Sequence, residues 1–247
     1  MRYIKLFSLV LLVGLAGGTL FARTQGPDSK IQASIHDKIY RAHVFDHGQV
    51  QAAYNQGVAT LTGTVDNLGS KLDAERAARK VEGVTQVLNN IQVRAEDWNI
   101  HQMLEQARRE IVTYYAYGIF DNVALRAEGN KLVVSGQVTQ PFKKQDIGKI
   151  LARVKGVAAF ENDLEVLPAS FFDDNLRAAI AQAIYNDPFF VYYSNQAVPP
   201  VHIIVKNGNV TLEGVVATTL DRTKAEMAAR LAGTSFSVTN NLRIERS

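Results

Sequence analysis

Hydrophobic positions follow two different periods along the first part of the chain. Isoleucines stand four residues apart over residues 31–39, which is typical of one face of a helix. Over residues 57–65 apolar and hydroxyl side chains alternate, as in a strand with one buried face. An apolar stripe over residues 74–81 predicts a second helix, and the segment 87–93 predicts a last strand. With a more polar extended segment at 49–54, the predicted order is helix, strand, strand, helix, strand.

This order occurs three times, and a glycine in the middle strand marks each copy. Gly136 follows Gly63 by 73 residues, and Gly214 follows Gly136 by 78. The later copies begin with helical stripes over residues 103–111 and 176–184. The sequence therefore predicts an α+β fold of three tandem αββαβ modules, each a small three-stranded mixed sheet packed against two helices. The predicted modules are residues 28–95, 99–167 and 173–246, joined near residues 95–99 and 167–173.

The recurring glycines are predicted to be structural, for two different reasons. Glycine weakens a strand, so the place of Gly63 and its equivalents on the apolar face predicts a helix that crosses closely there. Gly83 and Gly156 stand where the second helix ends, which predicts a left-handed backbone. The structural set is Gly63, Gly83, Gly136, Gly156, Gly214 and Gly233.

The third copy carries two local signals of its own. Asn207 and Gly208 form the pair that favours a two-residue type I′ hairpin turn. Asp173 or Asp174 is expected to cap the first helix of this copy, because a short carboxylate can accept hydrogen bonds from the first turn. Extra residues also precede its first strand, and its last strand is predicted at 238–244.

The strand pattern Leu-x-Gly-x-Val, followed by a helix and a Gly-Val pair, resembles the BON domain family. The resemblance covers nearly all of the chain after residue 28, in three copies with one register. The third copy departs from the pattern, with Gly233-Thr234 in place of Gly-Val, and the first copy has a polar first strand. The resemblance implies a periplasmic or envelope protein, associated with osmotic-stress protection and attachment to phospholipid membranes.

The N-terminus is predicted to be a secretory signal peptide over residues 1–22. Arg2 and Lys5 precede an uncharged apolar stretch that ends at Ala22, and this stretch is shorter than the roughly 20 apolar residues that span a bilayer. We therefore expect export to the periplasm. Leu20 stands where a small residue is usual before the cleavage site, so an uncleaved membrane anchor remains the alternative.

Charge and cysteine content exclude several classes of protein. The chain has 27 basic and 24 acidic residues, and loss of Arg2 and Lys5 with the leader leaves 25 against 24, a net charge of +1. A nucleic-acid partner is not expected, since such proteins rely on a strong positive field. Without cysteine, the chain has no lipoprotein anchor, disulfide or thiolate metal site.

No motif for catalysis, for cofactor binding or for a small-molecule substrate is recognised. The sequence lacks a Gly-x-Ser-x-Gly elbow and a Gly-x-Gly-x-x-Gly fingerprint. His43 and His47 have helical i, i+4 spacing beside Asp46, but zinc sites normally need three or four protein ligands. We predict a solvated turn there, and a protein that is not an enzyme and has no cofactor or metal.

A basic segment in the second helix of the middle copy is the first candidate for binding. Lys149 and Arg153 are four residues apart and opposite the aliphatic stripe, which predicts an exposed pair of like charges. An anionic bilayer would relieve their repulsion, at about 1 kcal/mol for each Lys or Arg near the surface. An ordinary solvated helix face is the alternative. The candidate residues are Lys144, Lys149, Arg153 and Lys155, with Lys143 beside them.

Aromatic side chains are the second candidate for membrane contact. One cluster lies in the insertion of the third copy, where irregular backbone can present rings to a membrane interface. For most of these rings we favour packing of one module against the next, because a module of this size buries a limited part of its surface. The candidates are Phe189, Phe190, Tyr192, Tyr193 and the linker residue Trp98, and a second cluster comprises Tyr114, Tyr115, Tyr117 and Phe120.

The sequence therefore supports a non-catalytic exported protein that associates with anionic envelope phospholipid. Envelope maintenance or osmotic-stress protection is the role that the family resemblance implies. A protein-interaction scaffold for an envelope or cell-wall assembly is the alternative, because tandem modules multiply weak contacts by effective concentration. The ligand, the oligomeric state and the orientation of the modules stay open at this stage.

Overall fold

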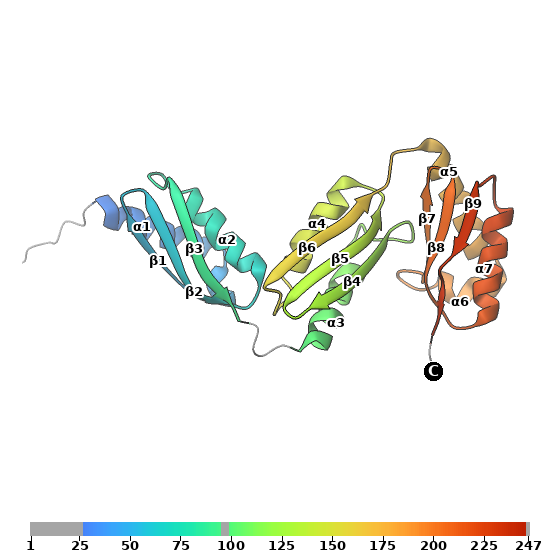
Figure 1. Cartoon of the computed structure of the whole chain (residues 1–247), viewed down its shortest axis with the longest axis horizontal. Helices are drawn as coiled ribbons and strands as arrows, with labels where there is room; N and C mark the ends of the chain where they lie inside the picture. The colour runs from blue at the N-terminus through green and yellow to red at the C-terminus, as the bar shows by residue number, and fades with distance from the viewer. Residues whose placement is uncertain (1–26, 95–98, 246–247) are drawn as a thin grey trace, which may run out of the picture.

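A computed structural model describes residues 27–94 and 99–245, and it confirms three αββαβ modules that follow one another along the long axis (Figure 1). The predicted signal peptide lies outside the described residues. Module 1 contains α1 (Pro27–Arg41), the 3₁₀ turn η1 (Val44–His47), β1 (Gly48–Asn55), β2 (Val58–Val65), α2 (Leu68–Arg79) and β3 (Gln86–Val93). Module 2 contains α3 (Ile100–Val112), β4 (Asn122–Glu128), β5 (Lys131–Val138), α4 (Pro141–Ala152) and β6 (Ala159–Val166). Module 3 contains α5 (Phe171–Tyr185), the 3₁₀ turn η2 (Pro188–Phe190), α6 (Val191–Ser194), β7 (Val201–Lys206), β8 (Asn209–Val216), α7 (Thr219–Leu231), β9 (Ser237–Asn240) and β10 (Arg243–Ile244).

Each sheet is mixed, with the glycine-bearing strand in the middle. In module 1, β2 pairs antiparallel with β1 and parallel with β3, so that Leu61 stands between Ala52 and Asn89. Modules 2 and 3 repeat this arrangement around β5 and β8. The last strand of module 3 differs from the predicted single segment, because it consists of β9 and β10, both parallel to β8.

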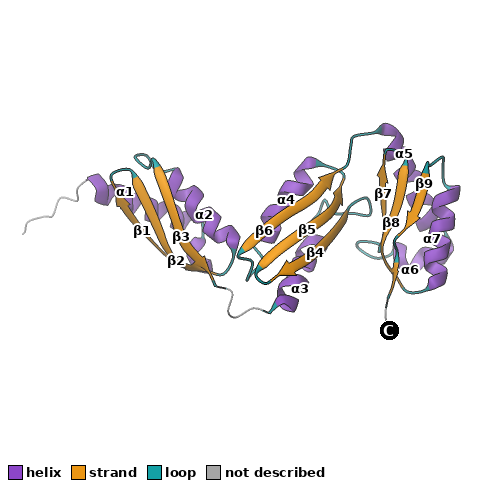
Figure 2. Cartoon of the chain, viewed as in Figure 1, coloured by secondary structure: helices purple, strands orange, loops and turns teal. Residues whose placement is uncertain are grey.

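Helices cover one face of each sheet and leave the other face open (Figure 2). Along β2, Ala59, Leu61 and Val65 are buried, whereas the intervening threonines are partly or fully exposed. The described residues form three separate cores, one for each module. The predicted alternation of a buried and a polar sheet face is therefore present.

A repeated asparagine fastens the last strand of every module to its second helix. Asn89 Nδ2 donates to the carbonyl oxygen of Lys71 in α2 at 2.9 Å, and Asn89 Oδ1 accepts from the backbone N–H of Ile91. Asn162 and Asn240 make the same contacts in the other modules. This explains why an Asn precedes the buried aliphatic residue of each last strand.

The strand glycines are required for a reason other than the predicted close helix. A Cβ at Gly63 would lie 2.1 Å from the carbonyl oxygen of Gln49 in the neighbouring strand β1. The backbone is also at φ +123°, where a side chain is strained. Gly136 and Gly214 are alike, with φ of +119° and +122°. A Cβ would lie 2.1 Å from the carbonyl oxygen of Asn122 in β4 and 1.9 Å from that of Pro200, just before β7. The expectation of a crossing helix is thus corrected to a close approach within the sheet.

The glycines after the second helix are left-handed, as predicted, in two of three modules. Gly83 has φ +89° and Gly156 has φ +83°. Each is the third residue of a turn closed by an i to i+3 hydrogen bond just beyond the helix. Gly233 is not in this region, and a Cβ there would lie 3.1 Å from Leu176 Cδ1.

The start of α5 corrects the predicted cap. Ser170 is the N-cap, and its side chain accepts from the backbone N–H of Asp173 at 3.2 Å. The buried carboxylate of Asp173 instead accepts the N–H groups of Asn207 and Gly208, each at 2.8 Å. These two residues form the predicted two-residue hairpin turn, with φ of +52° and +76°.

Candidate functional site

Modules 1 and 2 are joined by backbone hydrogen bonds next to the start of α2. The N–H of Leu68 donates to the carbonyl oxygen of Val157 at 2.9 Å, and the N–H of Gly156 donates to that of Asp66 at 2.8 Å. The side chain of Asn67 caps α2 by accepting from Ser70 N at 2.8 Å. The turn that follows α4 is therefore docked on the capped end of α2.

The side chains at this joint hold the two helices close together. Leu68, in module 1, packs against the core of module 2. Gly69 has no room for a side chain, because a Cβ there would lie 2.8 Å from Arg153 Cγ and 3.2 Å from the carbonyl oxygen of Ala152. The end of α4 thus rests directly on the first turn of α2.

A groove of about 570 Å³ lies between α2 and α4, on the surface of this joint. Its apolar lining includes Leu72, which is 42 % exposed, and Phe160, which is partly buried beneath Gly148. Among the described residues that line the groove, three are cationic and none is acidic. The groove is therefore apolar at its base and positive at its rim.

The rim cations come from both modules, and their carboxylate partners lie outside the lining. Arg76 of α2 and Arg153, the C-cap of α4, both bind the carboxylate of Asp73, with Arg153 Nη2 at 2.8 Å from Oδ2. Lys149 Nζ lies 3.0 Å from Asp146 Oδ1, and this contact holds the pKa of Asp146 below its usual value. Two guanidinium groups thus share one carboxylate, so positive charge is in excess at the joint.

These contacts correct the predicted pair of mutually repelling charges. Lys149 and Arg153 are exposed, at 66 % and 57 % of their side chains, but each has its own carboxylate partner. Lys155 Nζ is 3.9 Å from Asp66 Oδ2, which is again an acid of module 1. Arg153 and Lys155 therefore bind acids of module 1 across the joint, whereas Lys149 pairs with an acid of its own helix.

The remaining lysines of this segment lie elsewhere. Lys143 is mostly buried and forms a 2.7 Å ion pair with Asp121, whose side chain is only 1 % exposed. Lys144 is half-buried, and its carbonyl oxygen accepts from the repeated asparagine Asn162. Neither residue lines the groove.

The aromatic candidates of module 3 do not form one surface. Phe190 is fully buried, and Tyr193 is buried with its hydroxyl donating to Asp221 Oδ2 at 2.8 Å. Phe189 is half-buried beneath Lys224, whose Nζ lies 4.2 Å from the ring centroid. Only Tyr192 of this group is exposed, at 74 %. Burial of Phe190 and Tyr193 corrects the expectation that they reach a membrane. The reason is that the insertion folds into η2 and α6 instead of irregular backbone. Trp98 lies outside the described residues.

The aromatic cluster of module 2 contacts module 3, which agrees with the favoured interpretation of packing between modules. Phe120 packs against the core of module 3, and the ring of Tyr117 lies 5.6 Å from that of His202. The N–H of Ile203 donates to the carbonyl oxygen of Ile119 at 2.7 Å. In contrast, Tyr115 is 87 % exposed.

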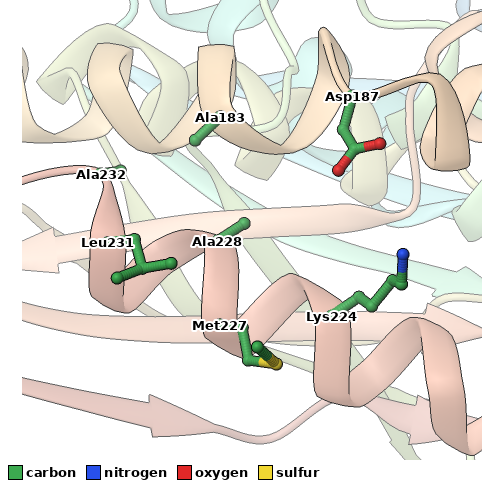
Figure 3. A pocket seen from close by; sticks show the side chains of 7 residues that line it. All are labelled: Ala183, Asp187, Lys224, Met227, Ala228, Leu231 and Ala232. Atoms are coloured by element: carbon green, nitrogen blue, oxygen red, sulfur yellow. The ribbon is translucent and has the colours of Figure 1, made fainter.

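A second groove, of about 390 Å³, separates α5 from α7 in module 3 (Figure 3). Ala183 of α5 and Ala228 of α7 point toward each other across the groove. Met227 and Leu231 of α7 also line it, and their side chains are exposed at 56 % and 82 %. Asp187 and Lys224 line the same groove, so its charges balance. This surface is apolar without an excess of either charge.

Sequence reasoning missed the module 1 half of the first groove and one exposed aromatic group. Arg76 and Leu72 carry no signal in the sequence, because Lys149 and Arg153, which line the groove with them, lie more than 70 positions away along the chain. Phe171, Phe172 and Phe236 are exposed at the start of α5 and before β9, and the rings of Phe172 and Phe236 flank Gly208 of the hairpin turn. Phe172 lies four residues before Leu176, on the same helical stripe, so the pattern predicts that its ring is buried. Phe172 is instead exposed, because it stands in the first turn of α5.

Within residues 27–94 and 99–245, no set of three or more His, Asp or Glu side chains gathers as metal ligands. The helices of these segments include none that is long and apolar enough to span a bilayer. His43 and His47 bind Asp46 and Asp66 respectively, each at 3.2 Å.

Comparison with known proteins identifies a family and distantly similar solved structures. The family model of the BON domain matches residues 27–95, 120–168 and 172–246. No curated protein sequence matches the chain. Two structures of CdsD, a structural protein of the type III secretion system of Chlamydia trachomatis, are similar in part. The C-terminal domain is 16 % identical, over 87 % of this chain and 96 % of that one, with a TM-score of 0.24. The other is 15 % identical, over 86 % and 93 %, with a TM-score of 0.26.

Proposed function

Because the match over all three modules shows that the chain belongs to the BON domain family, we propose that it is a non-catalytic protein that binds anionic phospholipid at an envelope membrane. The family is generally non-catalytic, and its members are typically associated with the cell envelope. Export to the periplasm and a role in envelope maintenance or osmotic-stress protection belong to the same proposal.

The observation that carries the proposal is the convergence of cations at the joint of modules 1 and 2. Arg76, Lys149 and Arg153 surround one groove, and none of the described residues that line this groove is acidic. Each Lys or Arg near an anionic bilayer contributes about 1 kcal/mol, so three give weak and reversible attachment. Such attachment suits a protein that binds at a surface without inserting a helix.

Co-sedimentation with liposomes over a salt series tests this proposal. We expect binding to phosphatidylglycerol vesicles that weakens with salt, and little binding to phosphatidylcholine vesicles. The triple variant Arg76→Gln, Lys149→Gln, Arg153→Gln should lose most of the binding. Glutamine is preferred to glutamate because Arg153→Glu would face Asp73 and open the joint.

A second triple variant controls for net charge. The changes Arg222→Gln, Arg230→Gln and Arg243→Gln remove the same charge from exposed positions of module 3 and should leave binding nearly unchanged. Equal loss in both variants would show that only net charge matters. Equal failure of the unmodified protein with both kinds of vesicle would refute the proposal.

A protein-interaction scaffold is the second candidate, and the groove between α5 and α7 favours it. Met227 and Leu231 stand four residues apart on α7, and both leave large apolar side chains exposed next to that groove. Its balanced charge gives an anionic lipid no advantage there. Pull-down from a delipidated envelope extract should recover a specific partner that Met227→Glu with Leu231→Glu releases, whereas a protein that binds only lipid should recover none.

A further inference from the structure

The groove between α2 and α4 has an apolar base and a rim of three cations, and none of the described residues that line it is acidic. The depression beside Lys30, Lys38 and Lys80 also combines apolar side chains with an excess of positive charge, but Glu82 is part of its lining. The groove of module 3 is apolar but carries one acid and one base, and the depression beside Arg41 includes Asp73 and is mainly polar. A ligand that fits both features is an anionic amphiphile.

We propose that this groove holds one acyl chain of a single anionic phospholipid, with the lipid phosphate against Arg76, Lys149 and Arg153; the inference rests on the proposed function. Its volume, about 570 Å³, falls within the roughly 300–1,000 Å³ of ordinary small-molecule sites. Guanidinium groups bind phosphate oxygens through paired N–H donors. The phosphate thereby gives the two arginines a second anionic partner beside Asp73.

The shape of the base suits a chain of methylene groups. Gly148 carries no side chain, and a Cβ there would lie 3.5 Å from the ring of Phe160 and 3.1 Å from Asn162 Nδ2. The missing side chain leaves the ring partly open to the groove. Leu72, across from it on α2, is 42 % exposed and gains burial when an acyl chain lies over it.

The groove is also held in place before any ligand arrives. Its two walls are tied by the backbone bonds of Leu68 and Gly156 and by the Arg153–Asp73 ion pair. A preorganised site binds without an ordering cost in the protein. Modules 1 and 2 each supply one wall, so neither module alone contains the site.

Titration of the full chain with dioctanoyl phosphatidylglycerol below its micelle concentration tests the inference, read by native mass spectrometry and calorimetry. We expect one lipid per chain, weaker binding of dioctanoyl phosphatidylcholine, and little binding of inorganic phosphate. If phosphate binds as tightly as the lipid, the site is an anion site only and the acyl-chain inference is overturned.

Two leucines of module 1 provide a matched pair of variants. Leu72 lines the groove and Leu88 lies on β3, and both are 42 % exposed. Leu72→Trp fills the groove and should weaken lipid binding about tenfold, the equivalent of roughly two buried CH₂ groups, whereas Leu88→Trp should not. Leu72→Asp, which adds no bulk, should weaken it as well. Equal binding by all variants would overturn the inference.

The outcome also separates this inference from the proposed function. Loss of short-chain lipid binding with intact liposome binding would remove the groove site and leave surface attachment. Binding of the short-chain lipid without liposome binding would keep the groove and remove the membrane role.

Discussion

The guanidinium of Arg153 binds the carboxylate of Asp73 across 80 positions of sequence, with Nη2 and Oδ2 2.8 Å apart. Asp73 lies on α2 and is only 16 % exposed, and Arg76 binds it from the same helix. One acid of module 1 thus orients a cation from each module. The geometry of the candidate site depends on that carboxylate.

Asp73→Asn should therefore strengthen binding to anionic vesicles while it loosens the joint. The change frees two arginines and adds one unit of positive charge, worth about 1 kcal/mol or about fivefold in affinity. Liposome co-sedimentation measures the first effect, and small-angle scattering measures the second. Asp46→Asn makes the same change in charge at an exposed turn of module 1 and should alter neither.

The middle-strand glycines give a test of the fold. Gly136→Ala should destabilise module 2 by about 1–3 kcal/mol from backbone strain at φ +119°, and the contact with Asn122 O adds to this cost. Gly118→Ala is the matched control, since a Cβ there meets nothing within 4 Å and should change stability by less than about 0.5 kcal/mol. Urea unfolding measures both changes. Equal effects would contradict the assigned role of Gly136.

The architecture was predictable because its signals are local and are repeated. In the stripe of α1, Ile35 and Ile39 are buried and Ile31 is partly buried against the same core, and the Asn207–Gly208 turn formed as expected. The reason for Gly63 was not predictable, because a glycine on an apolar face is compatible with either a nearby helix or a nearby strand. Only the coordinates show that the strand carbonyl of Gln49 occupies the space.

Half of the candidate site was predictable, and the other half was not. Lys149 and Arg153 are visible as a basic group in one helix, but periodicity cannot show that α2 lies beside them. The prediction of exposed aromatic side chains was wrong in part for a related reason. Phe190 and Tyr192 are two positions apart in the sequence, but the first is buried and the second is exposed. Burial of individual rings in an insertion depends on how that insertion folds.

A buried histidine predicts that the joint of modules 2 and 3 is sensitive to acid. Burial lowers the pKa of His202, although the carbonyl oxygens of Asp121 and Gly118 and the carboxylates of Asp121 and Glu213 oppose the shift. Tyr117, which faces the imidazole, stays neutral because burial raises its pKa to about 12. The folded state therefore holds His202 neutral.

Stability should fall as the pH drops below about 6.5, the ordinary pKa of histidine. Below that value the unfolded chain binds a proton at His202 that the folded chain resists, so acid favours unfolding. His202→Phe removes the loss of stability that protonation of His202 causes, while the carboxylates of the protein still titrate. Thermal unfolding from pH 7.5 to 5.0 should show a smaller loss in the variant, and identical pH profiles would contradict the assignment.

Asp121 holds the loop between α3 and β4 of module 2, which contacts module 3, and loss of its carboxylate should affect both modules. Its carboxylate accepts from Gly118 N, from Thr139 N and Oγ1, and from Lys143 Nζ at 2.7 Å, and its side chain is 1 % exposed. Removal of one partner from a buried ion pair costs about 3–5 kcal/mol, because the other charge stays buried. Asp121→Ala should destabilise module 2 by that amount in urea unfolding. Glu128→Ala removes an exposed carboxylate of the same module and should cost at most about 1 kcal/mol.

The same substitution should also weaken the contact with module 3, because the loop presents Ile119 and Phe120 to it. The N–H of Ile203 is protected by the carbonyl oxygen of Ile119 at 2.7 Å, so its hydrogen exchange reports directly on this contact. We expect faster exchange at Ile203 in Asp121→Ala, and unchanged exchange at Leu68, whose N–H belongs to the other joint. Faster exchange at both amides would mean that the substitution unfolds module 2 as a whole instead of freeing one loop.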